Sequence, residues 1–170
     1  MERSSVAAEI RLFVTDVDGT MTDGGMYYTA HGDHMKRFNT RDGMGLSMLR
    51  DAGIEVAMMT GEDSEIVVRR AEKLKIQHVY VGVSDKLSLL REVCGLLDVP
   101  LGCVAYVGDD VNDLEVIKNV GLALAVSDAD FRIAEAADVR LSLRGGEGAV
   151  REAAEWILAR RTSKVVGADQ

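Results

Sequence analysis

The sequence has few of the residues that mark disulfide-rich or linker-joined proteins. Among 170 residues it holds one proline, Pro100, and two cysteines, Cys94 and Cys103, and aromatic side chains make up 5%. The cysteines stand apart among apolar neighbours and form no CxxC pair, which predicts buried, reduced thiols instead of a disulfide framework. No low-complexity linker or internal repeat divides the chain. We therefore expect residues 1–170 to form a single domain.

Basic residues and long apolar runs are also scarce. Lysine and arginine number 20 against 28 aspartates and glutamates, so the formal net charge is -8. A nucleic-acid partner calls for a basic face, so we expect none. No apolar run approaches the ~20 residues of a membrane span, and "MERSSVAAEI" has no apolar signal core. These absences predict a cytoplasmic protein without a membrane partner. A small anionic substrate is still compatible with the charge, because a metal can override it locally.

Short apolar runs alternate with helical patterns along the chain. Several runs are apolar at nearly every position, which is typical of strands covered on both faces. The alternation predicts an α/β fold, a three-layer Rossmann-like parallel sheet flanked by helices, with no separate cap domain. The expected strands are 10–16, 54–60, 78–82, 103–109, 122–126 and 138–142, and the expected helices are 43–52, 63–75, 84–98, 110–119, 128–137 and 147–161. After Trp156 we expect the helix to end and the terminus to fray.

One segment, residues 24–40, interrupts this alternation. It reads "GGMYYTAHGDHMKRFNT", with two short aromatic or mixed runs around "HGD". This pattern predicts a β-hairpin inserted after the first strand, and a surface loop is the alternative.

Polar residues gather where the predicted strands end. These ends carry Asp16-Val17-Asp18, Thr60-Gly61-Glu62 and Gly108-Asp109-Asp110, and Lys86 follows in the first turn of a helix. Ligands of open parallel sheets bind at the carboxyl ends of the strands, so we expect these side chains to meet in one crevice.

The converging carboxylates predict a metal site. Asp16, Asp18, Asp109, Asp110 and Asp113 could not all stay ionised in one crevice without a cation. Oxygen ligands favour a hard divalent ion, with Mg²⁺ the first choice. An EF-hand calcium loop is excluded, because it needs flanking helices and glycine at its sixth position, whereas "DVDGT" follows a strand and has glycine fourth.

The neighbouring strand ends offer groups that hold phosphate. The hydroxyl of Thr60, the backbone at Gly61 and the ammonium of Lys86 can bind phosphoryl oxygens, and phosphoryl transfer depends mostly on positioning and charge neutralisation. A carboxylate can act as the nucleophile when a metal screens it. A second carboxylate two residues on can protonate the leaving oxygen and then deprotonate water.

These residues resemble the four motifs of the haloacid dehalogenase superfamily, in order and spacing. The motifs are "DVDGT", Thr60, Lys86 and "GDDVND". The resemblance implies that Asp16 is a nucleophile forming an aspartyl-phosphate and that Asp18 is the general acid and base. It implies Mg²⁺ held by Asp16, the Asp18 carbonyl and Asp109, supported by Asp110 or Asp113, with phosphate on Thr60 and Lys86. With aspartate at position 18, the motif resembles that of the phosphatase branch of this superfamily. The alternative is that these aspartates are ordinary turn and helix-cap residues.

The whole chain resembles the capless subfamily that dephosphorylates 2-keto-3-deoxy sugar acid phosphates. The matching stretches are "DGGMYY", "KRFNTRDGMG", "GVSDKL", "VAYVGDDVND" and "RGGEGAVRE". The resemblance to this subfamily implies a homotetramer in which the hairpin of one subunit covers the neighbour's active site. The resemblance implies that Met26, Tyr27 and Tyr28 take part in that contact, and ordinary hairpin packing is the alternative.

The stretch "TGEDSEIVVRRAEKLK" bears on the substrate. At Glu62 and Lys73 the sequence resembles the enzymes that act on nine-carbon, sialic acid-type 9-phosphates (2-keto-3-deoxynononate or N-acylneuraminate). Glu147 favours the same substrate. The alternative substrate is 3-deoxy-D-manno-octulosonate 8-phosphate, on the route to lipopolysaccharide. Arg70 and Lys73, three apart on one helix face, would bind the substrate carboxylate. The competing interpretation is a solvated face in which Glu65 pairs with Arg69.

The sequence thus predicts a Mg²⁺-dependent phosphatase of a nine-carbon sugar acid phosphate. Thr40 and Arg41, just after the hairpin, are weaker candidates for its substrate pocket. A hypothesis of another class is a regulatory or scaffolding module that has kept the fold and lost catalysis. The intact strand-end residues disfavour that hypothesis.

Overall fold

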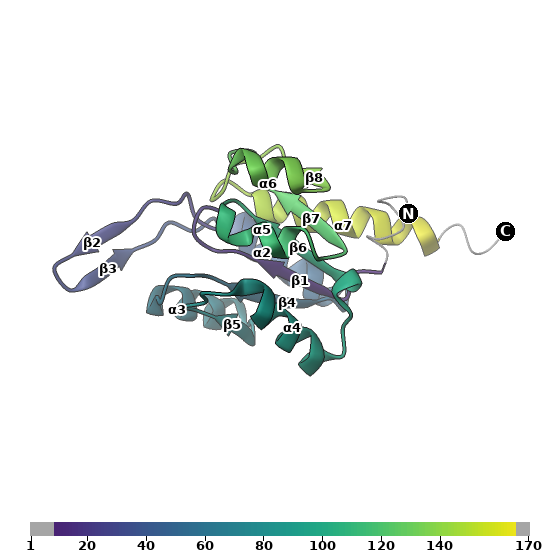
Figure 1. The fold of residues 1–170 in the computed structure, drawn as a ribbon, viewed down its shortest axis with the longest axis horizontal. Coiled ribbons are helices and arrows are strands. Elements are labelled where there is room, and N and C mark those ends of the chain that lie inside the picture. Colours follow the sequence, from purple (N-terminus) through teal and green to yellow (C-terminus); the bar gives the residue numbers. More distant parts are fainter. Residues whose placement is uncertain (1–8, 166–170) are drawn as a thin grey trace.

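A six-stranded parallel sheet forms the centre of the molecule (Figure 1). The computed structural model describes residues 9–165. The sheet has the order β5-β4-β1-β6-β7-β8, and every pair of neighbours is parallel. Its strands are β1 (Leu12–Thr15), β4 (Glu55–Met59), β5 (His78–Tyr80), β6 (Val104–Gly108), β7 (Leu122–Ala125) and β8 (Val139–Arg140). The predicted α/β fold with a parallel sheet is confirmed.

The strand order places one crevice at the middle of the sheet. Counted along the chain, the six sheet strands are arranged 3-2-1-4-5-6, the order of the Rossmann fold. The order reverses between β1 and β6, which pair in register from Leu12 with Val104 to Thr15 with Val107. Chain connections leave this point in opposite directions, so the carboxyl ends of β1 and β6 border an open crevice.

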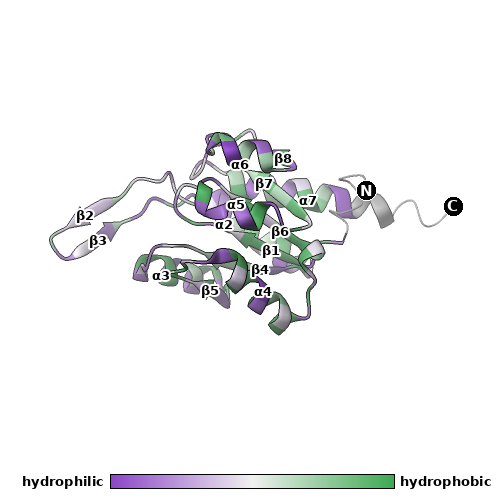
Figure 2. Ribbon diagram, viewed as in Figure 1, coloured by the Kyte–Doolittle hydropathy of each residue, from purple (hydrophilic) through white to green (hydrophobic). Residues whose placement is uncertain are grey.

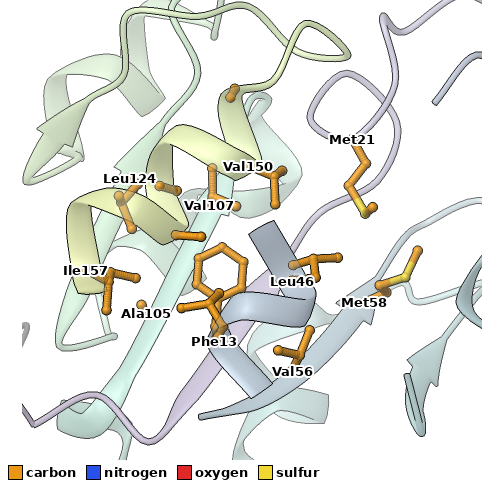
Figure 3. Packing of buried hydrophobic residues seen from close by; sticks show 14 of the residues in the cluster. Phe13, Met21, Leu46, Val56, Met58, Ala105, Val107, Leu124, Val150 and Ile157 are labelled. Carbon is orange, nitrogen blue, oxygen red and sulfur yellow. The ribbon is translucent and has the colours of Figure 1, made fainter. Parts of the chain in front are cut away.

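Helices cover both faces of the sheet, because side chains along each strand alternate between two buried clusters. Phe13 packs on one face and its neighbours Leu12 and Val14 pack on the other. The first face is covered by α2 (Thr40–Asp51), α3 (Glu65–Leu74) and α7 (Ala149–Val165), and the second by α4 (Lys86–Leu97), α5 (Leu114–Ile117) and α6 (Phe131–Ala136). Figure 3 shows the Phe13 ring among Leu46 of α2 and Val150 and Ile157 of α7.

Helices α2, α4 and α6 begin directly after capping residues, and these positions differ from the starts that the hydrophobic pattern predicted. The carboxamide of Asn39 accepts a hydrogen bond from the Arg41 backbone N–H, so α2 begins at Thr40 and not at the expected residue 43. Asp85 and Asp130 cap α4 and α6 in the same way, at Lys86 and Phe131.

The helix predicted over 110–119 was wrong in type and length. Residues Val111–Asp113 form a 3-10 helix (η2), and only Leu114–Ile117 are α-helical. The tighter first turn lets the buried Asp113 accept a hydrogen bond from the Asp109 backbone N–H at 3.1 Å. A second 3-10 helix, η1 (Leu101–Cys103), precedes β6.

The predicted hairpin after β1 is confirmed. It consists of β2 (Tyr27–Thr29) and β3 (Gly32–Met35), and it projects from one end of the molecule (Figure 1). The turn lies one position earlier than "HGD", because Gly32 is already paired with Thr29. Met26, Tyr27, Tyr28 and Met35 are exposed on it, with Tyr28 60% exposed.

Apolar residues are concentrated in the central strands, as Figure 2 shows. Within residues 9–165, no helix has the length and apolar character needed to cross a bilayer. The last helix continues to Val165, and the frayed terminus expected after it lies outside the described residues.

A buried carboxyl group joins α2 to α7. Asp42 is fully buried, and its Oδ1 accepts a hydrogen bond from the Arg151 backbone N–H at 3.0 Å, while its Oδ2 has no partner among the described residues. The helices are close here, since a Cβ at Gly45 would lie 2.8 Å from the Arg151 Cα. Burial raises the pKa of Asp42 to about 6, although backbone N–H groups at the start of α7 oppose that shift.

Asp42 should therefore make stability depend on pH. Its native pKa lies above the ordinary value, so the native state binds its proton more tightly. This contribution is full near pH 4 and is lost as pH rises through about 6. We expect Asp42→Asn to gain up to about 3 kcal/mol relative to the parent chain between pH 4 and pH 7.5, measured by urea unfolding. A shift of the opposite sign would mean that the α7 N-terminus stabilises the carboxylate more than burial penalises it.

Candidate functional site

The residues predicted at the strand ends meet beside the β1–β6 crevice. Asp16 directly follows β1, and its backbone N–H donates to the Val107 carbonyl of β6 at 3.0 Å. Asp109 directly follows β6, and Thr60 directly follows β4 on the other side of β1. The site thus draws on three neighbouring strands, as the strand-end rule predicted.

Lys86 binds two of the aspartates in a buried cluster. Its Nζ lies 2.5 Å from Asp16 Oδ1 and 2.6 Å from Asp113 Oδ1, and all three side chains are at most 4% exposed. The hydroxyl of Tyr106, also buried, donates to the same Asp113 oxygen at 2.6 Å. Lys86 has three donors and uses two of them on these carboxylates. One donor is left that can face the crevice.

Burial and mutual repulsion disturb the protonation of these carboxyl groups. Burial, then the nearby Asp113, raise the pKa of Asp16 well above its ordinary value, and Lys86 opposes the rise. The same two causes raise the pKa of Asp109 to about 6. Burial by itself lowers the pKa of Lys86, but Asp16 and Asp113 more than offset it, so its pKa is raised and the ammonium stays charged.

The carboxylates fit a divalent cation. Asp16, Asp109 and Asp113 each bring one carboxylate oxygen within 4.8 Å of the others, and Asp16 Oδ2 is buried without a hydrogen-bond partner in the part of the chain that the structure describes. Three carboxylates and the Lys86 ammonium leave two negative charges, which such a cation would balance. Oxygen donors of this kind suit Mg²⁺. Asp110 is outside this group: it is exposed and accepts from the Val111 N–H as the cap of η2.

Asp18 lies in the same crevice and is held by two donors. The Thr60 hydroxyl donates to its Oδ2 at 2.8 Å, and the ammonium of Lys36 donates to its Oδ1 at 2.7 Å. Thr60 Oγ1 also accepts from the Glu62 backbone N–H at 3.1 Å. Lys36, which follows β3 of the hairpin, is a site residue that the sequence analysis missed.

A second glycine-rich loop supports the turn that carries Asp18. The Gly146 N–H donates to the Thr20 carbonyl at 3.1 Å. A Cβ at Gly145 would clash with the Gly19 carbonyl oxygen, and a Cβ at Gly19 would clash with the Asp109 carboxylate. Glycine at these positions allows the close approach of segments that lie far apart in the sequence.

The residues predicted to bind substrate do not all gather in one place. Glu62 lines a cavity of about 420 Å³ between the hairpin and the start of α3, together with Tyr28, Asp33 and Ser64. Gly61 and Lys73 are exposed, and no polar contact of the Lys73 side chain is seen within the described residues. Thr40, the first residue of α2, and Glu147 are also exposed, and Arg41 lines a different cavity of about 440 Å³ with Arg151 and Glu155.

Arg70 contacts Asn39 and Phe38 of its own chain, although it was expected to bind the substrate carboxylate together with Lys73. Its guanidinium donates to the Asn39 carbonyl at 3.3 Å and lies 5.4 Å from the centre of the Phe38 ring. The exposed ion pair between Arg69 and Glu65, at 2.6 Å, is the contact expected for a solvated helix face.

Comparisons with known proteins bear on the family of the chain. Residues 43–121 match the family described as haloacid dehalogenase-like hydrolase. The 3-deoxy-D-manno-octulosonate 8-phosphate phosphatase KdsC of Yersinia pestis is 43% identical over 152 residues, which cover 89% of this chain and 81% of that protein. The chain belongs to the haloacid dehalogenase-like hydrolases, within the branch of capless 2-keto-3-deoxy sugar acid phosphate phosphatases.

Solved structures of haloacid dehalogenase-like phosphatases share this fold. The cobalt-bound octulosonate 8-phosphate phosphatase from Haemophilus influenzae is 38% identical, with a TM-score of 0.90 over 97% of this chain and 96% of that one. The Moraxella catarrhalis phosphatase, solved in complex with magnesium, phosphate and KDO, is 36% identical, with a TM-score of 0.91 over 99% and 98%. The resemblance to this superfamily and to its capless branch, inferred from the motifs, is confirmed.

A divalent cation should stabilise this phosphatase fold through the three clustered carboxylates. We expect Mg²⁺ at 100 times its dissociation constant to raise the free energy of unfolding by about 2.7 kcal/mol. Binding needs ionised carboxyl groups, so the gain should increase as pH rises through about 6, near the pKa of Asp109.

Thermal unfolding with and without Mg²⁺ measures the gain. Asp109→Asn should lose it, whereas Glu115→Gln, an exposed carboxylate on α5, should keep it. An equal gain in both variants would show that the ion binds elsewhere.

Proposed function

We propose that the chain is a Mg²⁺-dependent phosphatase that hydrolyses 3-deoxy-D-manno-octulosonate 8-phosphate through an aspartyl-phosphate on Asp16. The observation that carries the proposal is the buried Asp16 carboxylate, which has one oxygen on Lys86 and the other without a partner among the described residues. Asp18, two residues on, accepts a hydrogen bond from Thr60 at the end of the neighbouring strand β4. The names of the relatives supply the substrate.

In the first half of the reaction Asp16 Oδ2 attacks the phosphorus atom. The bond between phosphorus and the sugar oxygen breaks, its electron pair goes to that oxygen, and Asp18 supplies the proton that the oxygen takes up. Thr60, the backbone at Gly61 and the third donor of Lys86 hold the phosphoryl oxygens. Lys86 also keeps Asp16 oriented through its 2.5 Å contact.

In the second half Asp18 acts as the base. It takes a proton from a water molecule whose oxygen attacks phosphorus, the bond to Asp16 breaks, and inorganic phosphate leaves. The enzyme returns to its starting state, with Asp16 again a free carboxylate and Asp18 again carrying its proton.

Mg²⁺ would be held by the Asp16 and Asp109 carboxylates and the Asp18 carbonyl, with Asp113 in support, and Asp110 is a second candidate for support. When bound, it supplies the positive charge that lets an anionic nucleophile approach an anionic phosphate. Asp113 fixes this arrangement by accepting from Lys86, Tyr106 and the Asp109 backbone.

The eight-carbon substrate is better supported than the nine-carbon substrate that the sequence analysis preferred. Relatives at about 40% identity carry the octulosonate name. A nine-carbon acid 9-phosphate is the second candidate, because Glu62 lines the cavity between the hairpin and α3, where it could accept from sugar hydroxyls. Arg70 and Lys73 are the residues proposed for the substrate carboxylate, and they line neither of the two cavities described above.

Phosphate release with Mg²⁺ tests the proposal. We expect kcat/KM for the octulosonate ester to exceed that for the nine-carbon ester by about 10-fold or more, a difference of about 1.4 kcal/mol in activation free energy. Asp16→Asn should reduce turnover about 1,000-fold or more by removing the nucleophile.

The matched control is Asp23→Asn in the same loop, because Asp23 pairs with Arg37 at 3.0 Å and should leave turnover near that of the parent. The opposite preference would restore the nine-carbon hypothesis. Failure to release phosphate from any ester would support a non-catalytic module.

We also infer that the enzyme is a homotetramer in which the hairpin of residues 24–40 covers a neighbour's site. Four apolar side chains exposed on the projecting hairpin support this assembly: Met26, Tyr27, Tyr28 and Met35. A single chain has no cap domain, so a neighbour would have to exclude water from the crevice.

Light scattering after size-exclusion chromatography tests the assembly. We expect about four times the chain mass of 18.4 kDa, and a smaller species for Tyr28→Asp. Leu96→Asp is the control, because Leu96 is 75% exposed and lies on α4. A monomeric parent protein would contradict the assembly.

A further inference from the structure

Lys36, which follows β3 of the hairpin, contacts the site of its own chain. The side chain of Lys36 is 2% exposed, and its Nζ lies 2.7 Å from Asp18 Oδ1 and 3.7 Å from Asp33 Oδ2. Burying an ammonium is costly unless charged partners compensate it, so Asp18 and Asp33 together fix its position. The sulfur of Met26, 3.7 Å away, lies beside the same ammonium.

This contact belongs to a continuous set of polar contacts between hairpin and sheet. The hydroxyl of Ser64, which precedes α3, donates to Asp33 at 2.8 Å, and Asp33 neighbours Lys36. Lys36 donates to Asp18, and Asp18 accepts from Thr60 at the end of β4. The base of the hairpin therefore contacts the rest of the chain at two points: Asp33 accepts from Ser64, which precedes α3, and Lys36 donates to Asp18, which follows β1.

Both oxygens of the Asp18 carboxylate are held, but one of its donors has a second task. In the proposed reaction the Thr60 hydroxyl donates to the phosphoryl group, so it cannot hold Asp18 with the same hydrogen at that moment. Lys36 is then the contact that still orients the carboxyl group. We propose that Lys36 is a positioning residue that keeps Asp18 aimed at the ester oxygen of the leaving group.

This inference rests on the proposed phosphatase function and gives the hairpin a task within its own chain. Asp18 delivers its proton to the ester oxygen as the bond from phosphorus to that oxygen breaks. A sugar alkoxide is a poor leaving group and needs this proton, whereas p-nitrophenolate is stabilised by its own ring and needs it little. A displaced Asp18 should therefore slow the sugar ester more than the aryl ester.

The test compares two esters in Lys36→Met, which keeps an unbranched side chain of similar length and removes its charge. We expect kcat/KM for the better of the two sugar acid phosphates to fall about 10-fold or more beyond the fall for p-nitrophenyl phosphate. Both values come from one preparation, so a lower folded fraction cancels in their ratio. Arg37→Met is the matched control, because Arg37 is the next residue, is 60% exposed and pairs with Asp23. Its ratio should equal that of the parent.

A double-mutant cycle tests whether Lys36 acts through Asp18. In an Asp18→Asn background, Lys36→Met should reduce kcat/KM for the sugar ester by less than about 3-fold, because the group that it positions is already gone. Equal losses for both esters, or additive losses in the cycle, would overturn the inference and leave Lys36 as an anchor of the hairpin. A parent enzyme that hydrolyses neither ester would instead overturn the proposed function itself.

Discussion

Lys86 places its ammonium between Asp16 and Asp113 where all three side chains are buried, and the geometry of the site follows from that contact. A lysine at the first position of α4 sits at the positive end of a helix and out of water, two conditions that disfavour its charge. It is retained there because two carboxylates compensate it. The contact fixes α4 relative to the ends of β1 and β6, and it leaves the second oxygen of Asp16 without a partner.

The remaining negative charge explains why the site suits a metal-assisted reaction. Burial, then Asp113 and to a smaller extent Asp109, raise the cost of ionising Asp16, and Lys86 offsets only part of that total. A divalent cation would remove the remainder and leave a nucleophile beside an anionic substrate. The close contact of Gly19 with the Asp109 carboxylate and of Gly145 with the Gly19 carbonyl holds these groups at a fixed spacing. The glycine loops thus fix the spacing of the charged groups as well as the path of the backbone.

Much of this could be predicted from the sequence, because strand-end positions in a parallel sheet determine what meets at its edge. Asp16, Thr60 and Asp109 follow apolar strands, so their convergence needed only the sheet topology. Lys36 could not be predicted in this way, since its direction depends on how the hairpin bends back toward Ser64. Arg70 shows the reverse case. Spacing along α3 placed it with Lys73, but the Phe38 ring and the Asn39 carbonyl, 32 and 31 residues earlier in the chain, determine where it lies.

The proposed mechanism requires that Asp16 carry the phosphoryl group during turnover. Quenching the enzyme with acid during turnover, then reducing with borohydride, converts a phosphorylated aspartate to homoserine, which mass spectrometry locates after tryptic digestion. Trypsin should release residues 12–36 as one peptide, because Arg11 precedes it and Lys36 ends it. We expect homoserine at position 16 of the chain, dependent on both substrate and Mg²⁺. Turnover with unmodified Asp16, or with homoserine at position 18 instead, would contradict it.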